Sequence, residues 1–333
     1  MPFFRFLNAA GGTRQSENCL SPNVWTPGLD DARRPVLVWI HGGAFLIGAG
    51  STPVYEGQDL ARRGDLVVVT INYRLGALGY MHLNGVCGEQ FGDACNVGLR
   101  DQLAALEWVR DNIDRFGGDP GNVTVFGQSA GAMSVGSILG APRARELFHR
   151  AICQSGAAQH VLSQEQATRI AEVFLEKLGN PPRTQEALAG IPASRLLKAQ
   201  AETNRDLANL TQLMVFLPVV DGEVIPEPPL DAVAAGAIAD VPILLGTTLD
   251  EWKLFTPVDT GIPAIGERGL VERMEEVLPV AAPRAPAPAK AIRSYRKAVK
   301  ARGGDTSPFE VWSAFQSARV FHYPATRLAE AQC

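Results

Sequence analysis

Residues 123–131 read Val-Thr-Val-Phe-Gly-Gln-Ser-Ala-Gly, and residues 132–139 continue as Ala-Met-Ser-Val-Gly-Ser-Ile-Leu. An apolar run, a serine between glycines and a second apolar run predict a strand, a tight turn and a helix. In that setting G-x-S-x-G holds the serine in a strained backbone conformation and lifts its hydroxyl clear of the sheet. Ser129 is therefore a candidate nucleophile, and the N–H of Ala130 is a candidate donor to a substrate oxygen. The alternative is a glycine-rich turn with an incidental serine.

A second glycine-containing loop lies upstream, at residues 41–45. The apolar run 35–40 is typical of a short buried parallel strand, and it ends in His-Gly-Gly-Ala-Phe. Acyl transfer builds negative charge on a carbonyl oxygen, and small residues let backbone N–H groups approach closely enough to stabilise it. This loop therefore predicts further oxyanion donors, with His41 orienting the loop. A common glycine turn after a strand is the alternative.

Composition limits the possible classes of function. The 333 residues are 46% hydrophobic, enough for a large core in one big domain or two. A net charge of -4, from 31 basic and 35 acidic residues, gives no electrostatic case for nucleic-acid binding. No apolar run reaches the length of a membrane span, and the first ten residues lack the apolar stretch of a signal peptide. The five cysteines show no metal-ligand spacing, so we expect reduced thiols, a cytoplasmic location and no metal, although Cys87 and Cys95 could pair.

Strand-like and helix-like segments alternate along the chain. Short apolar runs predict strands at residues 35–40, 66–73, 123–126, 150–154 and 241–246. A helix that stops at residues 117–120 is predicted by the spacing of Leu99, Leu103, Leu106, Val109 and Ile113. Ser163 and Gln166 predict a capping box at the start of another helix, which ends at Gly179. The alternation predicts an α/β fold with a mostly parallel central sheet flanked by helices.

Two stretches look helical without strand signals, around residues 160–213 and 260–320. We expect them to flank a single catalytic domain that spans residues 1–333. Within the second stretch, the proline- and alanine-rich residues 279–289 predict an irregular connection. Residues 290–302 predict a basic helix with a solvated face.

Taken together, the motifs resemble those of the type B carboxylesterases, the α/β-hydrolase group that includes para-nitrobenzyl esterases and cholinesterases. The resemblance covers nearly the whole chain and implies the α/β-hydrolase fold. The matching segments are residues 16–20, 23–27, 41–45, 96–102, 116–120, 127–131, 147–156 and 246–251.

The resemblance also implies roles for individual residues. Ser129 matches the acyl-forming nucleophile, and the oxyanion donors match Gly43, Ala44 and Ala130, with Gly42 permitting the approach of the loop. Glu251 matches the acid of the catalytic triad, which must hold an imidazole in the right tautomer. By sequence alone, Asp250 is the rival acid. Trp252 stands where many relatives have glycine, and Gln128 stands where cholinesterases have glutamate.

The histidine is the main departure from the family pattern. The order serine, acid, histidine requires a histidine after Glu251, and only His322 of the five meets that requirement. The family places its histidine further along, in a His-x-x-Glu-type motif. We therefore expect the catalytic histidine to lie beyond Cys333 and the chain to be truncated at both ends relative to the family. His322 is the less favoured candidate for the base.

The resemblance implies a carboxylic-ester hydrolase that acts on a small-molecule ester without a cofactor. The oligomeric state is left open. One alternative is an esterase of the hormone-sensitive-lipase type, which the motifs at residues 16–27 and 246–251 disfavour. A second alternative is a catalytically impaired or non-catalytic α/β-hydrolase-like binding module. The missing histidine favours that module, and the intact elbow at Ser129 argues against it.

Overall fold

The computed structural model describes residues 15–207, 214–255, 264–281 and 286–333. The chain divides into two compact units: residues 246–327 form the smaller unit, and residues 2–245 with residues 328–333 form the larger one. A single catalytic domain over residues 1–333 stays a prediction.

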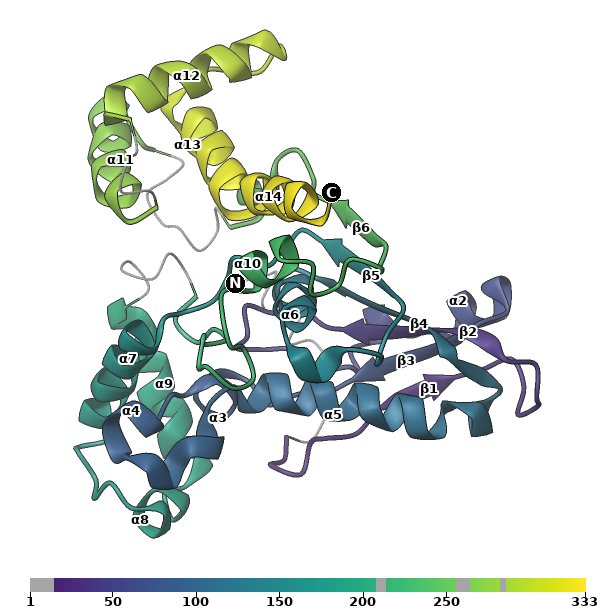
Figure 1. The fold of residues 1–333 in the computed structure, drawn as a ribbon. Helices are drawn as coiled ribbons and strands as arrows, with labels where there is room; N and C mark the ends of the chain where they lie inside the picture. Colours follow the sequence, from purple (N-terminus) through teal and green to yellow (C-terminus); the bar gives the residue numbers. More distant parts are fainter. Residues whose placement is uncertain (1–14, 208–213, 256–263, 282–285) are drawn as a thin grey trace. The chain divides into compact units, whose positions relative to one another are not determined.

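The larger unit is built on a six-stranded sheet with the order β1-β3-β2-β4-β5-β6 (Figure 1). Its strands are β1 Asn23–Trp25, β2 Arg34–Ile40, β3 Val67–Ile71, β4 Gly118–Gln128, β5 Arg150–Gln154 and β6 Ile243–Gly246. The pairs β2–β3, β2–β4 and β4–β5 are parallel, whereas β1 runs antiparallel to β3. The predicted mostly parallel sheet is confirmed, and the three-residue strand β1 is an addition to it.

The register of the central strands sets up the candidate site. Ile40, the last residue of β2, pairs with Gly127 near the end of β4, so the segments that follow both strands leave the sheet at the same edge. β4 is longer than the predicted run because it starts at Gly118, which pairs with Arg34 across an irregularity in the ladder. Pro120 is tolerated in that irregular part, since a proline cannot donate to a regular ladder.

Helices flank the sheet, and their buried side chains form much of the hydrophobic core of the larger unit. Those of the larger unit are α2 Gln58–Gly64, α3 Gly76–Tyr80, α4 Asn84–Cys87, α5 Val97–Asn112, α6 Ala130–Leu139, α7 Gln164–Lys177, α8 Gln185–Ala189, α9 Ala193–Leu207 and α10 Pro229–Ala234. The predicted apolar repeat of α5 is fully buried, and every residue of α6 is buried as well. These two helices pack against β4 and against each other.

Helices α3, α4, α7, α8 and α9 gather beside one end of α5 (Figure 1). The predicted capping box of α7 is present: Ser163 Oγ accepts from the Gln166 N–H, and the Gln166 side chain accepts from the Ser163 N–H. The predicted helical stretch after residue 184 is two helices, because Pro192 separates α8 from α9. Its last residues, 208–213, lie outside the described part of the chain.

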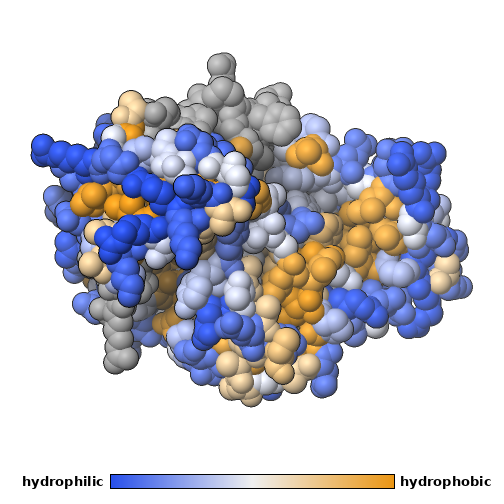
Figure 2. Space-filling view, turned by 90° about the horizontal axis from the view of Figure 1, so that it is seen from above, coloured by the Kyte–Doolittle hydropathy of each residue, from blue (hydrophilic) through white to orange (hydrophobic). Residues whose placement is uncertain are grey.

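On the face drawn in Figure 2, apolar residues reach the surface in several places between charged ones. Large exposed apolar side chains include Leu29, Val54, Leu244 and Leu249. None of the helices in the described ranges is both long enough and apolar enough to cross a membrane.

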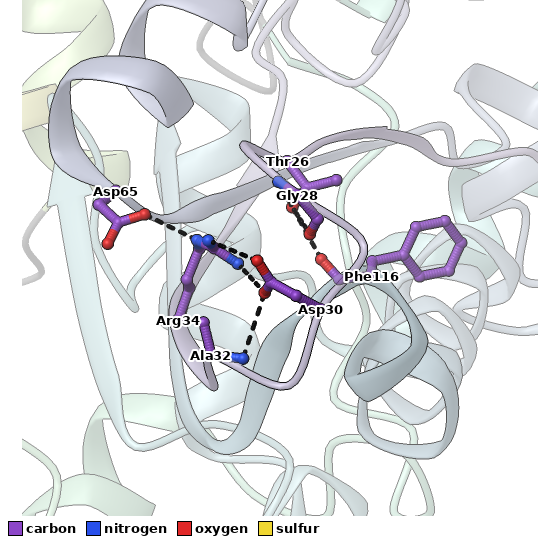
Figure 3. A network of polar contacts seen from close by, with 7 residues as sticks. All are labelled: Thr26, Gly28, Asp30, Ala32, Arg34, Asp65 and Phe116. Atoms are coloured by element: carbon purple, nitrogen blue, oxygen red, sulfur yellow. Dashed lines mark hydrogen bonds and ion pairs between the residues drawn. The ribbon is translucent and has the colours of Figure 1, made fainter.

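A polar network holds the start of β2 in place (Figure 3). Arg34 Nε donates to Asp65 Oδ1 at 2.7 Å, and Arg34 Nη2 donates to Asp30 Oδ2 at 3.1 Å. The hydrogen bond to Asp30 and, to a smaller extent, the one to Asp65 raise the pKa of the Arg34 guanidinium above its usual value. Thr26 Oγ1 donates to the Phe116 carbonyl at 2.8 Å, which ties the segment before β2 to the turn before β4. Both carboxylates are exposed, so these pairs add little stability, and their effect is to fix where β2 and β4 begin.

The smaller unit is helical. It contains α11 Glu267–Ala281, α12 Pro288–Ala301, α13 Pro308–Ser317, a turn of π-helix at Ala318–His322 and the start of α14 Tyr323–Gln332. Buried apolar residues of these helices form its core, among them Leu270, Met274, Trp312, Phe315 and Phe321. The predicted basic helix at residues 290–302 is confirmed as α12, which buries Ile292 and Val299 on one side.

The predicted irregular connection at residues 279–289 is wrong at both ends. α11 continues through Pro279 to Ala281, and α12 begins at Pro288. A proline in the first helical turn removes an N–H that has no partner there anyway, which explains Pro288. Pro279 lies in the last turn of α11, where it removes one helical hydrogen bond, and the helix still continues to Ala281. Residues 282–285 lie outside the described part of the chain.

Candidate active site

Ser129 lies at the junction of β4 and α6, as the motif predicts. Its backbone has φ 56° and ψ -125°, in the region that favours glycine, which costs on the order of 1–3 kcal/mol for a serine. Two backbone hydrogen bonds stabilise this conformation: the Ser129 N–H donates to Gln154 O, and Ser129 O accepts from the Met133 N–H, each at 2.9 Å. The side chain is half-buried and leaves the sheet at the edge where β2 also ends.

The second glycine of the motif is required by close backbone packing. A methyl group at Gly131 would lie 2.0 Å from the Ile40 carbonyl oxygen and 2.9 Å from that of His41. Neither oxygen can move aside easily, because Ile40 is the last paired residue of β2. Gly131 therefore lets the start of α6 lie directly against the end of β2.

We expect Gly131→Ala to lower the free energy of unfolding by about 3 kcal/mol, because the added methyl group overlaps fixed backbone atoms. Urea denaturation followed by circular dichroism measures the change. Gly92→Ala is the matched control, since a methyl group there meets no atom within 4 Å. Equal stability of the two variants would contradict the packing assigned to Gly131.

The 41–45 loop lies against Ser129. A methyl group at Gly42 would be 3.2 Å from Ser129 Cβ and 2.7 Å from the Gln128 carbonyl oxygen, so only glycine allows this approach. Gly43, Ala44 and Phe45 all have positive φ, at 121°, 56° and 59°. Three such residues in a row turn the chain sharply. Sharp turns of this kind recur where a protein binds anions through backbone N–H groups.

The N–H groups of Gly43, Ala44 and Ala130 are free to serve a ligand. Within the described residues, none of them donates a hydrogen bond to the protein. Ala130 is the first residue of α6, where the helix leaves its N–H groups unpaired and its dipole favours negative charge. The arrangement is suited to a developing oxyanion beside Ser129.

The contacts of His41 connect the loop to the residues behind it. Its Nδ1 lies 2.8 Å from the Gly42 carbonyl oxygen, its ring stacks on Tyr73, and Tyr73 Oη donates to the His41 carbonyl oxygen at 2.8 Å. Burial lowers the pKa of His41 to about 4, so the ring is neutral near pH 7. This geometry supports a role for His41 in orienting the loop. Tyr73 was not identified from the sequence as a site residue, although it is the last residue of the predicted strand at 66–73.

The buried imidazole makes stability depend on pH. Below the ordinary histidine pKa of 6.5 the unfolded chain binds a proton at His41 that the folded protein does not bind until about pH 4. The neutral His41 ring therefore costs the folded protein no stability above pH 6.5. As the pH falls from 6.5 toward 4, the free energy of unfolding decreases by up to about 3 kcal/mol. Urea unfolding across that range should show a shallower pH dependence in His41→Gln than in the parent. Parallel curves for the two proteins would contradict the prediction.

Gly156 is a site residue that sequence reasoning missed. A methyl group at Gly156 would lie 2.6 Å from Ser129 O and 3.0 Å from Met133 N, the two atoms of the first hydrogen bond of α6. Gly156 follows β5 and belongs to a motif of the family resemblance, but nothing in its local pattern indicates contact with Ser129. That contact arises because β5 pairs with β4 up to Gln128.

The two candidate acids belong to the smaller unit and differ in environment. Glu251 is 8% exposed, and its Oε1 accepts from the Thr248 N–H at 2.7 Å. Asp250 is exposed and forms ion pairs with Lys253 at 3.3 Å and Arg302 at 4.0 Å. A buried, oriented carboxylate suits the role of triad acid better than one in surface ion pairs, which supports Glu251. Its placement opposite Ser129 stays a prediction, since the two residues belong to different units.

The histidines make contacts of their own. In the larger unit His82 Nδ1 lies 3.3 Å from Cys95 Sγ, and His149 Nδ1 accepts from the Val123 N–H at 3.1 Å. In the smaller unit His322 Nε2 lies 2.9 Å from the Thr248 carbonyl oxygen, so this nitrogen carries the proton and donates. Among the described residues of the larger unit, the Ser129 hydroxyl has no imidazole partner.

All five cysteines are free, so the possible Cys87–Cys95 pair is not formed. In the part of the chain that is described, no three histidine, cysteine, aspartate or glutamate side chains gather as ligands for a metal ion.

Comparison with known proteins identifies a family and several relatives. The carboxylesterase family model matches residues 4–329. The para-nitrobenzyl esterase of Bacillus subtilis (strain 168) is 47% identical over 250 residues, which is 75% of this chain and 50% of that protein. The phenmedipham hydrolase of Pseudarthrobacter oxydans is 40% identical over 249 residues, covering 74% of this chain and 48% of that protein.

A solved structure is similar as well. The carboxylesterase EST55 of Geobacillus stearothermophilus is 43% identical, with a TM-score of 0.85 over 95% of this chain and 63% of that one. The chain thus spans about half the length of the curated relatives it matches.

Proposed function

Because this chain belongs to the carboxylesterase family, we propose that it hydrolyses small-molecule carboxylic esters through an acyl-serine intermediate on Ser129. The family resemblance and the α/β-hydrolase fold predicted from the motifs are confirmed. The observation that carries the proposal is the contact between the strained Ser129 elbow and Gly42 of the 41–45 loop.

In the proposed reaction, Ser129 Oγ attacks the ester carbonyl carbon and a general base takes the hydroxyl proton. The resulting oxyanion accepts hydrogen bonds from the N–H groups of Gly43, Ala44 and Ala130. Collapse of this intermediate releases the alcohol, which takes up that proton, and leaves the acyl group on Ser129. Water then attacks the acyl-serine by the same route and releases the acid. The groups named here need no cofactor or metal.

The acid and the base complete the proposal. Glu251 orients and stabilises the imidazole that acts as base. His322 follows Glu251 in the chain, but it precedes the position at which the family places its histidine, so it stays the less favoured candidate for the base. The five free cysteines are consistent with the proposed cytoplasmic location, where thiols stay reduced.

A fluorophosphonate probe tests the nucleophile directly. We expect covalent labelling at Ser129, because an elbow serine beside oxyanion donors is the group that such probes trap. Peptide mass spectrometry identifies the labelled residue. Ser155 is the internal control: it also has positive φ and precedes a glycine, but it starts no helix. Labelling of Ser155 with Ser129 unmodified would exclude the assignment.

One observation favours the alternative, a non-catalytic binding module. Among the described residues of the larger unit the Ser129 hydroxyl has no imidazole partner, and a serine hydroxyl without a base is a weak nucleophile. The two functions differ in turnover of a para-nitrophenyl or para-nitrobenzyl ester, the latter suggested by the name of the Bacillus subtilis relative. Ester binding without hydrolysis above the uncatalysed rate would establish the module.

A further inference from the structure

A pocket of about 620 Å³ lies in the larger unit among residues that the proposed reaction does not use. Helices α3, α7, α8 and α9 contribute to its wall, together with the segment between α4 and α5. Buried apolar side chains form its inner part, namely Met81, Phe91, Phe174, Leu175 and Leu178. Neither Ser129 nor any residue of the 41–45 loop lines it. Its size falls in the range of small-molecule sites, which are mostly apolar with a few polar groups.

Hydrogen bonds between distant segments hold this pocket open. Arg183 Nη1 donates to the Val86 carbonyl oxygen at 2.8 Å, and Gln185 Nε2 donates to the Gln90 carbonyl oxygen at 2.7 Å. Gln90 Nε2 donates in turn to the Arg183 carbonyl oxygen at 3.2 Å. These contacts join the residues at the start of α8 to α4 and to the segment that follows it, so the wall is formed without a ligand. A preformed wall lowers the ordering cost of binding.

The polar groups of the pocket disfavour an anionic ligand. Arg74 lines it, but its Nε and Nη2 are bound to the buried Asp101 carboxylate at 2.8 and 2.6 Å. Glu17 also lines the pocket and adds a second carboxylate, so the three groups carry a net charge of about -1 near pH 7. The polar groups do not favour a cationic ligand either. Glu17 is exposed to solvent, which screens its attraction for a cation, and the apolar wall would remove the hydration of the cation.

We propose that this pocket is a second binding site, for a small uncharged molecule with an apolar ring or chain. The apolar part occupies the space between α3, α7 and α9, and a neutral polar end faces Arg74 and the amides of Gln90 and Gln185. Half-buried Leu188 and Leu196 and the exposed Leu78 leave apolar surface open to water in the free protein, and such a ligand would cover it. The site is independent of the proposed ester hydrolysis.

The test uses two dyes that share an anilinonaphthalene ring system. N-phenyl-1-naphthylamine is uncharged, whereas 8-anilino-1-naphthalenesulfonate carries a sulfonate. We expect saturable binding of the uncharged dye to the full chain by fluorescence, and roughly tenfold weaker binding of the sulfonate. Modifying Ser129 with an organophosphate should leave both affinities unchanged, which separates this site from the ester site.

Matched variants on α9 locate the dye, which is needed because apolar side chains also reach the surface elsewhere (Figure 2). Leu196 lines the pocket, whereas its neighbour Leu197 is 45% exposed and does not. We expect Leu196→Glu to weaken binding of the uncharged dye at least about tenfold and Leu197→Glu to leave it within about twofold. Ala189→Trp, at an exposed lining position on α8, should block the pocket by volume if Leu196→Glu does not fold.

Three results would overturn the proposal. Equal effects of Leu196→Glu and Leu197→Glu would show general adsorption of the dye. Loss of binding after Ser129 modification would place the dye in the ester site. Binding of the sulfonate as tight as that of the uncharged dye would rule out the assigned class of ligand.

Discussion

Ser129→Ala is expected to lower kcat for a para-nitrophenyl ester by at least about 10⁴-fold, because the acyl-serine intermediate can no longer form. Alanine removes only the hydroxyl, and the backbone hydrogen bonds that stabilise the elbow are unaffected. Residual hydrolysis should still exceed the reaction in water, since oxyanion donors and substrate binding act without the nucleophile. Initial rates at saturating ester, with circular dichroism as the check on folding, measure the change.

Ser137→Ala is the matched control for this variant. Ser137 lies on the same helix, α6, and its hydroxyl donates to the Met133 carbonyl oxygen one turn earlier. Its loss should leave kcat within about twofold, since such a bond back to the helix contributes little to stability. If the two variants lose activity equally, the effect is one of folding. If Ser129→Ala retains the parent rate, the elbow is not the site of acyl transfer.

The features that could be predicted from the sequence are those formed by consecutive residues. The elbow at Ser129 and the glycine loop after β2 in the site, and the capping box at Ser163 in the fold, each occupy a few adjacent positions with strict steric or hydrogen-bonding requirements. The buried strands were predictable because parallel strands covered on both faces appear as continuous apolar runs. β1 was missed, since three half-buried residues give no such run.

The parts that were missed depend on which segments the fold brings together. Gly156 lies beside Ser129 only because β5 pairs with β4, and Tyr73 reaches His41 only because β3 pairs with β2. Both residues look ordinary in their own segments. The pocket beside α3 is a further example, because its lining comes from segments between residues 17 and 196. Sequence patterns identify reactive groups more readily than the residues that position them.

Glu251→Gln is expected to lower kcat by about 10⁴-fold with little change in folding. The amide keeps an oxygen that can accept from the Thr248 N–H, so the local hydrogen bond survives. It carries no charge, however, and cannot stabilise the imidazolium that forms as the base takes the proton of Ser129. An amide can also donate to the imidazole and so hold it in the wrong tautomer. The loss should appear mainly in kcat, because the carboxylate acts in the transition state rather than in substrate binding.

Asp250→Asn is the control that separates the two adjacent acids. Asp250 is exposed and pairs with Lys253 and Arg302, and surface pairs of this kind contribute roughly 0–1 kcal/mol. Its amide variant should therefore keep kcat within about twofold. A large loss in Asp250→Asn with a normal rate in Glu251→Gln would reverse the assignment of the acid. Normal rates in both variants would mean that neither carboxylate orients the base, and hydrolysis at Ser129 would then need an acid from another part of the fold.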